Sequence, residues 1–351
     1  MAAAMEKSRG TPHWQGWQRN RSWRGYGYAL LTIVCWASTP TVAKLSMTTV
    51  NGVAATFYAN LFALPVLLLI LRSRNGMEML RKLTLPDVAL GLGIGSLGGC
   101  AYYLCYYSSF LFINVNAAVA RNYLYPLLTV LFVELGTRRR PPQPHIVAGL
   151  VVSFAGAFFI ITRGASVAWQ WNWGVVLAVG AASVWGLFSA LAHRHRIDAV
   201  LLVTFGSAMG TAIPLVIFGL GGTIPYPGLR GLLGFSYLGA VPIALGVVLW
   251  LRALALAEPA HVAGLIYFTP FLAMLIAARA LGEHAGTFLI VGAALIVMGN
   301  LLSSVPLSLG RLIRQTNSPT LDRPDPEKDN SIADEGGSRY PEQKGDLRDD
   351  R

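Results

Sequence analysis

Charged side chains are scarce in this chain: they make up 13% of its 351 residues, whereas hydrophobic residues make up 54%. A water-soluble domain carries about a quarter charged residues, because they solvate its surface. With so few charges, a water-facing fold would leave a large apolar surface exposed to solvent. The composition therefore excludes an ordinary soluble domain and predicts a protein whose surrounding solvent is lipid.

Acidic residues are scarcer than basic ones, and the apolar stretches lack the residue patterns of catalytic sites. Between residues 26 and 308 the acids lie only in loops or near the ends of apolar stretches: Glu78, Asp87, Glu134, Asp198, Glu258 and Glu283. The three cysteines, Cys35, Cys100 and Cys105, lack the spacing of a metal site. No histidine pair, nucleophile elbow or aspartate pair occurs within an apolar stretch. We predict that the chain is not an enzyme and binds no metal or cofactor.

Ten apolar stretches have the length of a membrane span. About 20 helical residues, at roughly 1.5 Å each, cross a hydrocarbon core about 30 Å thick. The stretches run approximately over residues 27–46, 53–71, 87–107, 116–137, 146–163, 173–193, 199–220, 232–251, 260–281 and 286–305. A soluble helical bundle would need a polar face on each helix, and stretches such as 61–71 have none. The pattern predicts an all-α membrane protein with ten transmembrane helices.

Lysine and arginine are distributed unequally between alternate loops. The N-terminal tail holds five, the second loop four and the fourth loop three consecutive arginines, whereas the loops 46–52 and 108–116 hold none. Short loops rich in Lys and Arg stay in the cytoplasm, so both termini are predicted to be cytoplasmic. The net charge of +11 then reflects loops facing anionic membrane lipid. Nucleic acid is not expected as a partner.

The two ends of the chain differ from its apolar middle. Residues 1–25 combine arginines with Trp14, Trp17 and Trp23, a mixture typical of segments that lie at the membrane interface. Residues 311–351 hold eight basic and ten acidic residues and several prolines. This composition predicts a disordered cytoplasmic tail.

An internal repeat divides the apolar part into two sets of five stretches, 26–163 and 173–306. Trp36 in the first stretch corresponds to Trp185 in the sixth, and Pro126 in the fourth corresponds to Pro270 in the ninth. The Trp-to-Pro separations are 90 and 85 residues. An odd number of spans per repeat makes the second copy enter the membrane from the opposite side. The spacing therefore predicts two inverted five-helix repeats around a central cavity, an architecture typical of transporters.

Three short runs carry a resemblance to a known family: Asn122-Tyr123-Leu124-Tyr125-Pro126, Tyr267-Phe268-Thr269-Pro270 and the segment around Trp36. Across almost all of residues 26–305 the chain resembles the EamA-type exporters of the drug/metabolite transporter superfamily, and within them the bacterial aromatic amino acid exporters. The resemblance implies a multi-pass protein of the bacterial inner membrane, with helices 1, 3, 4, 6, 8 and 9 lining a central cavity. It implies export of amino acids or related small metabolites.

Candidate site residues follow from this reading. We expect the following side chains to contact substrate: Trp36, Tyr103, Arg121, Asn122, Tyr123, Trp185 and Tyr267. Tyrosine and tryptophan present a planar apolar body with a polar handle. Arg121 is expected either to bind a carboxylate or to extend to the outer interface. The tyrosines at 102–107 are expected either at the cavity or in an interfacial belt. Pro126 and Pro270 are predicted to break their helices and act as hinges.

The sequence leaves the cargo open. Aromatic or neutral amino acids suit an aromatic cavity, and the alternatives to amino acids are lipophilic drugs, nucleotide sugars or lipid-linked compounds. A diphosphate would require several cationic residues in the cavity, and only Arg121 and Lys44 lie within predicted spans. Proton coupling usually requires a buried carboxylate or histidine. Since none is evident, facilitated export is expected at least as readily as proton-driven export.

Overall fold

The computed structural model describes residues 13–73, 76–138, 141–164, 172–195, 197–281 and 287–304. The predicted C-terminal tail (311–351) lies outside the described residues, as do residues 1–12 and Glu283. The described helices belong to one unit of the chain, which extends from Met1 to Val305.

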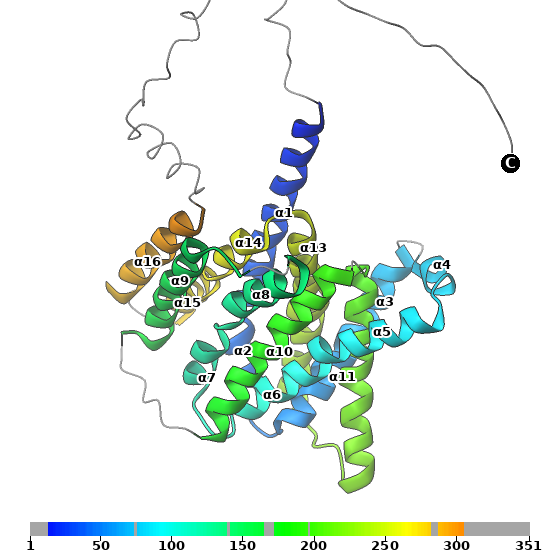
Figure 1. The fold of residues 1–351 in the computed structure, drawn as a ribbon. Coiled ribbons are helices and arrows are strands. Elements are labelled where there is room, and N and C mark those ends of the chain that lie inside the picture. Colours follow the sequence, from blue (N-terminus) through cyan, green and yellow to red (C-terminus); the bar gives the residue numbers. More distant parts are fainter. Residues whose placement is uncertain are drawn as a thin grey trace, which may run out of the picture. The chain divides into compact units, whose positions relative to one another are not determined.

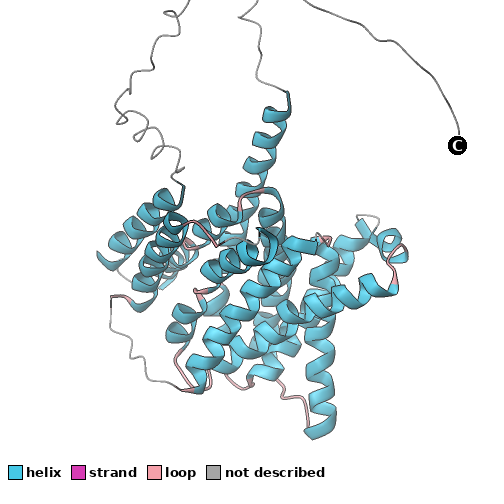
Figure 2. Ribbon diagram, viewed as in Figure 1, coloured by secondary structure: helices cyan, strands magenta, loops and turns pink. Residues whose placement is uncertain are grey.

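Helices make up all of the regular structure in the described residues (Figures 1 and 2). Those of the first half are α1 (His13–Ala37), α2 (Thr39–Ser46), α3 (Gly52–Ser73), α4 (Gly76–Arg81), α5 (Leu85–Ser96), η2 (Leu97–Ala101), α6 (Tyr102–Ser109), α7 (Val115–Asn122), α8 (Tyr125–Val133), η3 (Glu134–Arg138) and α9 (Pro144–Thr162). Those of the second half are α10 (Trp173–His195), α11 (Ala199–Gly221), α12 (Gly228–Leu238), η4 (Gly239–Val247), α13 (Val248–Leu256), α14 (Pro259–Ile266), α15 (Thr269–Leu281) and α16 (Thr287–Ser304). The η segments are π-helical.

Ten helical segments of the described chain are long and apolar enough to cross a membrane, which confirms the number predicted from the sequence. They are residues 22–46, 52–73, 85–109, 115–136, 144–162, 173–195, 199–221, 228–256, 259–276 and 287–304, referred to below as spans 1 to 10. Polar N-caps fix the start of several spans. The Asn114 side chain accepts a hydrogen bond from the Ala117 amide (2.8 Å), and Asp198 accepts one from the Val200 amide (2.9 Å).

The N-terminal segment is continuous with the first span. Residues 13–25 are not a separate element, because α1 continues without interruption from His13 to Ala37. The helix extends past the other helices at this end of the unit (Figure 1). Near the start of the first span, Gly25 packs against Ala257, where an added Cβ would lie 2.7 Å from the Ala257 Cβ. The first span is thus held by the second half of the chain at this end.

Equivalent spans of the two halves share the same irregularities. Spans 3 and 8 each contain a π-helical segment, η2 and η4. Spans 4 and 9 are each broken by a short turn, after Asn122 and after Ile266. Each break falls four residues before a proline, Pro126 or Pro270, whose ring clashes with the carbonyl of the fourth preceding residue. The helix breaks predicted at the two prolines are present.

Glycines allow close packing on both sides of the fold. Cβ atoms added at Gly149 and Gly299 would each lie 2.4 Å from the other residue's carbonyl oxygen, so α9 and α16 touch through their backbones. On the other side, an added Cβ at Gly99 would lie 2.0 Å from the Gly206 carbonyl oxygen of α11. Gly91, Gly95 and Gly99, at four-residue spacing in span 3, therefore form a close helix contact with α11.

Candidate substrate cavity

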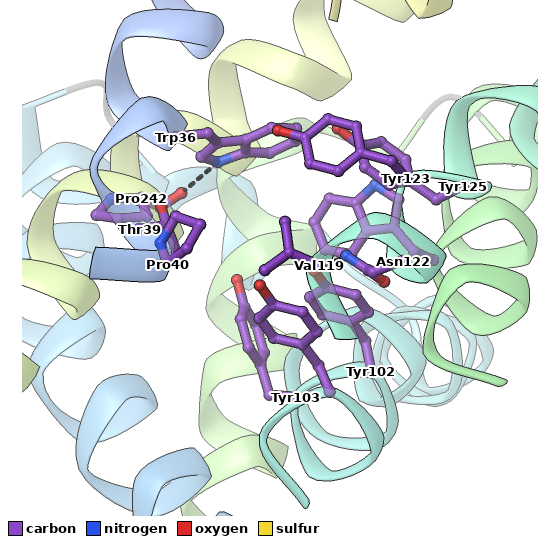
Figure 3. A pocket seen from close by; sticks show the side chains of 12 residues that line it. Trp36, Thr39, Pro40, Tyr102, Tyr103, Val119, Asn122, Tyr123, Tyr125 and Pro242 are labelled. Atoms are coloured by element: carbon purple, nitrogen blue, oxygen red, sulfur yellow. Dashed lines mark hydrogen bonds between the residues drawn. The ribbon is translucent and has the colours of Figure 1, made fainter. Parts of the chain in front are cut away.

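Near the middle of the fold, side chains from both halves enclose a small space, called here the inner cavity. It is lined by Trp36, Thr39, Pro40, Tyr102, Tyr103, Tyr106, Val119, Asn122, Tyr123, Tyr125, Trp185 and Pro242 (Figure 3). These residues come from spans 1, 3, 4, 6 and 8. The volume open to the centre of a water molecule is about 60 Å³. Because a single water requires roughly 10–15 Å³ on this measure, the inner cavity holds a few waters in this conformation.

Trp36 is fixed at the edge of the inner cavity by the second half of the chain. Its Nε1 donates a hydrogen bond of 3.0 Å to the carbonyl oxygen of Pro242 (Figure 3). Pro242 lies within the π-helical segment η4 of span 8. Gly246, one turn further, leaves room for the indole, since an added Cβ there would lie 2.5 Å from Trp36 Nε1. A proline and a glycine of the second repeat therefore orient a tryptophan of the first.

Four aromatic rings converge beside this hydrogen bond. The centroid of the Trp36 ring lies 5.6 Å from that of Trp185, 5.8 Å from that of Trp250 and 6.2 Å from that of Tyr125. Trp250 is fully buried behind the cavity, and its Nε1 donates to Ser189 Oγ at 2.9 Å. Edge-to-face pairs at these separations are favourable and rigid. The cluster therefore forms a preorganised aromatic wall.

The tyrosines of α6 form the opposite wall. Tyr103 and Tyr106 are 6% and 4% exposed, so they face protein and not lipid. Tyr102 and Tyr106 stack with ring planes 7° apart. The Tyr102 hydroxyl accepts a hydrogen bond of 3.1 Å from Asn122 Nδ2. Of the two positions expected for this cluster, the structure thus shows the cavity wall and not the interfacial belt, with Tyr107 buried outside the cavity lining.

A wider space, called here the outer cavity, adjoins the inner one. It is lined by Trp36, Ala37, Pro40, Thr41, Lys44, Leu45, Val115, Asn116, Val119, Tyr123, Ile160, Ile161, Arg163, Pro270, Ala273 and Met274. Its volume on the same measure is about 390 Å³, and its lining is predominantly apolar. Four residues line both cavities: Trp36, Pro40, Val119 and Tyr123. The two cavities are therefore neighbours separated by shared side chains.

The outer cavity is lined by residues near one set of span ends. Lys44 lies in the last turn of α2, Asn116 in the first turn of α7, and Arg163 directly after α9. These positions are the end of span 1, the start of span 4 and the end of span 5. If consecutive spans cross the bilayer in alternate directions, all three lie on the side opposite the N-terminus. Lys44 is exposed at this end of span 1.

Two of the predicted site residues line neither cavity. Arg121 is only 2% exposed, and its Nη1 donates to the Ala117 carbonyl at 2.9 Å, within its own helix. Its side chain extends toward the start of span 4, but it stays buried in protein and does not reach an interface. Tyr267 is fully buried behind Tyr123, with ring centroids 6.5 Å apart. Pro270 lines the outer cavity, whereas Pro126 lines neither.

Several lining residues were not among the predicted site residues. Tyr125 was noted only as part of a family run, and its ring contacts both Trp36 and Trp185, with both centroid separations at 6.2 Å. Thr39, Val119 and Pro242 also line the inner cavity. The aromatic character of Tyr125 was a usable signal. Thr39 and Val119 gave no such signal in the sequence, because small residues of this kind occur throughout the spans.

Neither cavity is lined by an acidic residue. Glu134, expected near a helix end, does begin the π-helical segment η3, but it is only 7% exposed and thus more deeply buried than expected. Among the described residues, no three His, Cys, Asp or Glu side chains are grouped as a metal site would require. The polar groups offered by the inner cavity are therefore neutral: hydroxyls, one amide and two indoles.

Sequence comparison places this arrangement in a family. The sequence profile of the EamA-like transporter family matches the chain twice, over residues 23–162 and 172–305. The chain belongs to the EamA-like transporter family. The two matches correspond to spans 1–5 and spans 6–10, so this EamA-like transporter contains two copies of the family's repeat.

Two curated relatives match most of this EamA-like transporter. An uncharacterized transporter of Archaeoglobus fulgidus is 24% identical over 281 residues, covering 78% of this chain and 95% of that protein. A probable terminal-alkyne amino-acid exporter of Streptantibioticus cattleyicolor is 28% identical over 282 residues, covering 78% of this chain and 91% of that protein. A solved crystal structure that is 20% identical superposes with a TM-score of 0.68, covering 80% of this chain and 96% of that one. The last match shows a shared fold.

Proposed function

We propose that this transporter exports amino acids with aromatic or other neutral side chains across the bacterial inner membrane by alternating access. The observation that carries the proposal is the pair of adjoining cavities. The inner one has an aromatic wall and neutral polar groups, and the outer one is predominantly apolar with Lys44 and Arg163 in its lining. Planar and apolar side chains gain contact area on such walls. The relative described as a probable amino-acid exporter supports the same class of cargo.

The conformation supports an assignment of sidedness. Lys and Arg are concentrated at the N-terminus and in the even-numbered loops, which supports a cytoplasmic position for both termini. The outer cavity then lies on the periplasmic side, and the structure corresponds to an outward-facing state. The cytoplasmic ends of spans 1 and 9 are joined by Tyr26 and His261, whose hydroxyl oxygen and Nδ1 lie 3.2 Å apart. An inward-facing state requires this contact and the packing of Gly25 against Ala257 to separate.

Counterflow in liposomes tests the proposal. Purified protein is reconstituted into vesicles loaded with unlabelled L-phenylalanine, and uptake of the labelled compound is followed against L-leucine and L-lysine as competitors. We expect exchange of L-phenylalanine, competition by L-leucine, and little competition by L-lysine, because no acidic residue lines either cavity and Lys44 and Arg163 line the outer one. Absence of exchange for every amino acid, together with exchange of a lipophilic dye, would establish the drug-efflux alternative instead.

A further inference from the structure

Three side chains that line the inner cavity carry a buried polar atom for which the described residues supply no hydrogen-bond partner. These atoms are Thr39 Oγ1, Asn122 Oδ1 and Trp185 Nε1. Asn122 and Trp185 are 5% and 3% exposed. Buried polar atoms in native proteins nearly always have partners, so three such atoms around one cavity point to a bound group that satisfies them.

The chemistry of the three atoms defines that group. An indole N–H only donates, an amide oxygen only accepts, and a threonine hydroxyl does both. The lining of the inner cavity contains no lysine, arginine, aspartate or glutamate. A group that fits must therefore offer a donor and an acceptor without a net charge. The ammonium and carboxylate of an α-amino acid, on one carbon atom, form such a group.

We infer that the inner cavity is the subsite for the ammonium and carboxylate groups of the transported amino acid, an assignment that rests on the proposed function. Asn122 Oδ1 accepts a hydrogen bond from the ammonium. Trp185 Nε1 and Thr39 Oγ1 donate to the carboxylate. The aromatic rings of Trp36 and Tyr125 also line the inner cavity, and aromatic rings attract cations.

The two cavity sizes suit the two ends of such a molecule. The side chain of the amino acid extends into the outer cavity, whose volume of about 390 Å³ and apolar lining accept a bulky group. The inner cavity, at about 60 Å³, must widen to admit the charged end. Tyr123 lines both cavities and lies in the turn that interrupts span 4. A small movement at this turn joins the two spaces.

The same three atoms select against lipophilic drugs. An apolar molecule in the inner cavity would leave all three polar atoms without partners. Sites built to hydrogen-bond a polar group reject analogues that lack it far more strongly than apolar pockets discriminate by size. The subsite therefore separates amino acids from the competing class of lipophilic cargo.

Analogues of one amino acid test this assignment on the unmodified protein. L-Phenylalanine, phenethylamine (no carboxylate) and 3-phenylpropionate (no ammonium) share the same ring. They are compared as competitors of labelled L-phenylalanine counterflow in reconstituted vesicles. We expect each analogue to compete about tenfold less well or worse, since each leaves one side of the subsite unpaired. Competition by both analogues as strong as that of L-phenylalanine would overturn the assignment.

Substitutions then assign each side of the subsite. Asn122→Leu removes the acceptor for the ammonium, so competition by 3-phenylpropionate should approach or exceed that of L-phenylalanine. Trp185→Phe removes a donor to the carboxylate, so competition by phenethylamine should increase relative to that by L-phenylalanine. Two matched controls lie outside the inner cavity. Thr211→Val removes a hydroxyl that bonds within α11, and Trp23→Phe changes an exposed ring. These ratios do not depend on the amount of folded protein, provided that some exchange remains.

Three outcomes separate the subsite from the transport function. Altered ratios in the two cavity variants alone support the subsite. Exchange of L-phenylalanine with the same ratios in every variant overturns the subsite and leaves amino-acid export standing. If a variant shows no exchange, equilibrium binding of the three compounds to the detergent-purified protein gives the same ratios. If the unmodified protein exchanges and binds none of the three, both the subsite and the proposed function fail.

Discussion

Trp36 of the first repeat and Trp185 of the second meet edge to face, with ring centroids 5.6 Å apart and planes at 74°. The sequence places the two tryptophans at matching positions of the repeat, five spans apart. The second matching pair, Tyr123 and Tyr267, also meets, at 6.5 Å. The aromatic wall is therefore built from matching residues of both repeats. In transporters of repeated architecture the substrate site lies where the repeats meet.

Trp36→Phe should weaken the connection between the repeats. The change removes the hydrogen bond from Nε1 to the Pro242 carbonyl and keeps an aromatic ring in place. A hydrogen bond of this kind contributes about 0.5–1.5 kcal/mol, so we expect initial rates of L-phenylalanine exchange to change by roughly two- to tenfold. Trp23→Phe, on a ring that is 68% exposed, is the control and should leave the rate unaltered. Equal effects of both substitutions would show that the Pro242 contact is unimportant.

Gly99→Ala should destabilise the protein through the contact between spans 3 and 7. The added methyl group would lie 2.0 Å from the Gly206 carbonyl oxygen, so the backbones must separate. Overpacking of this kind costs about 1–3 kcal/mol, which should appear as a clear drop in the thermal unfolding midpoint in detergent. Gly93→Ala, in the same span, is the matched control, because an added Cβ there meets nothing within 4 Å. Equal midpoints for the two variants would contradict the close contact.

Much of this fold follows from local signals in the sequence. The ten spans were predictable because each span must be apolar over its full length. The breaks in spans 4 and 9 were expected because Pro126 and Pro270 each remove a helical hydrogen bond, although Pro65 and Pro214 lie within continuous helices. The π-helical segments η2 and η4 were not foreseen. Their formation depends on how neighbouring helices pack, which single-sequence periodicity does not contain.

The candidate site was predictable only in part, for a related reason. Trp36, Asn122, Tyr123 and Trp185 were expected at the cavity and line it. The position of Arg121 was not predicted correctly, because a charged residue within a span is expected to bind a ligand or to reach an interface. Its Nη1 instead bonds to the Ala117 carbonyl of the preceding turn. A side chain that bonds back to its own helix cannot be distinguished by sequence from one that points into a cavity.

Ala273→Cys should react with a membrane-impermeant thiol reagent added from the periplasmic side. Ala273 lines the outer cavity, which lies at the span ends opposite the N-terminus. The experiment uses a background in which Cys35, Cys100 and Cys105 are replaced by alanine. Ser189→Cys is the control, because Ser189 is fully buried beneath Trp250 and should not react. Labelling of Ala273→Cys only from the cytoplasmic side would reverse the sidedness proposed for the structure.

Pro270→Ala should slow the conformational exchange more than it weakens substrate binding. Alanine restores the N–H group and removes the clash, so α14 and α15 can join into one helix. We expect the rate of exchange to fall severalfold, with a smaller change in the half-saturating concentration of L-phenylalanine because Pro270 also lines the outer cavity. Pro214→Ala is the matched control, since Pro214 lies within the continuous helix α11. A hinge role for Pro270 is contradicted if both variants exchange at the rate of the unmodified protein.

Export should proceed without a proton gradient. No acidic residue lines either cavity, so substrate and proton have no shared carboxylate along the described path. Glu134 is the buried carboxylate nearest to such a role, at the start of η3 and 7% exposed. We expect an imposed pH gradient to drive no accumulation of L-phenylalanine in vesicles, and Glu134→Gln to behave like the unmodified protein in this respect. Accumulation driven by the gradient and abolished in Glu134→Gln would instead identify Glu134 as the proton carrier, acting at a distance from the cavity through the fourth span.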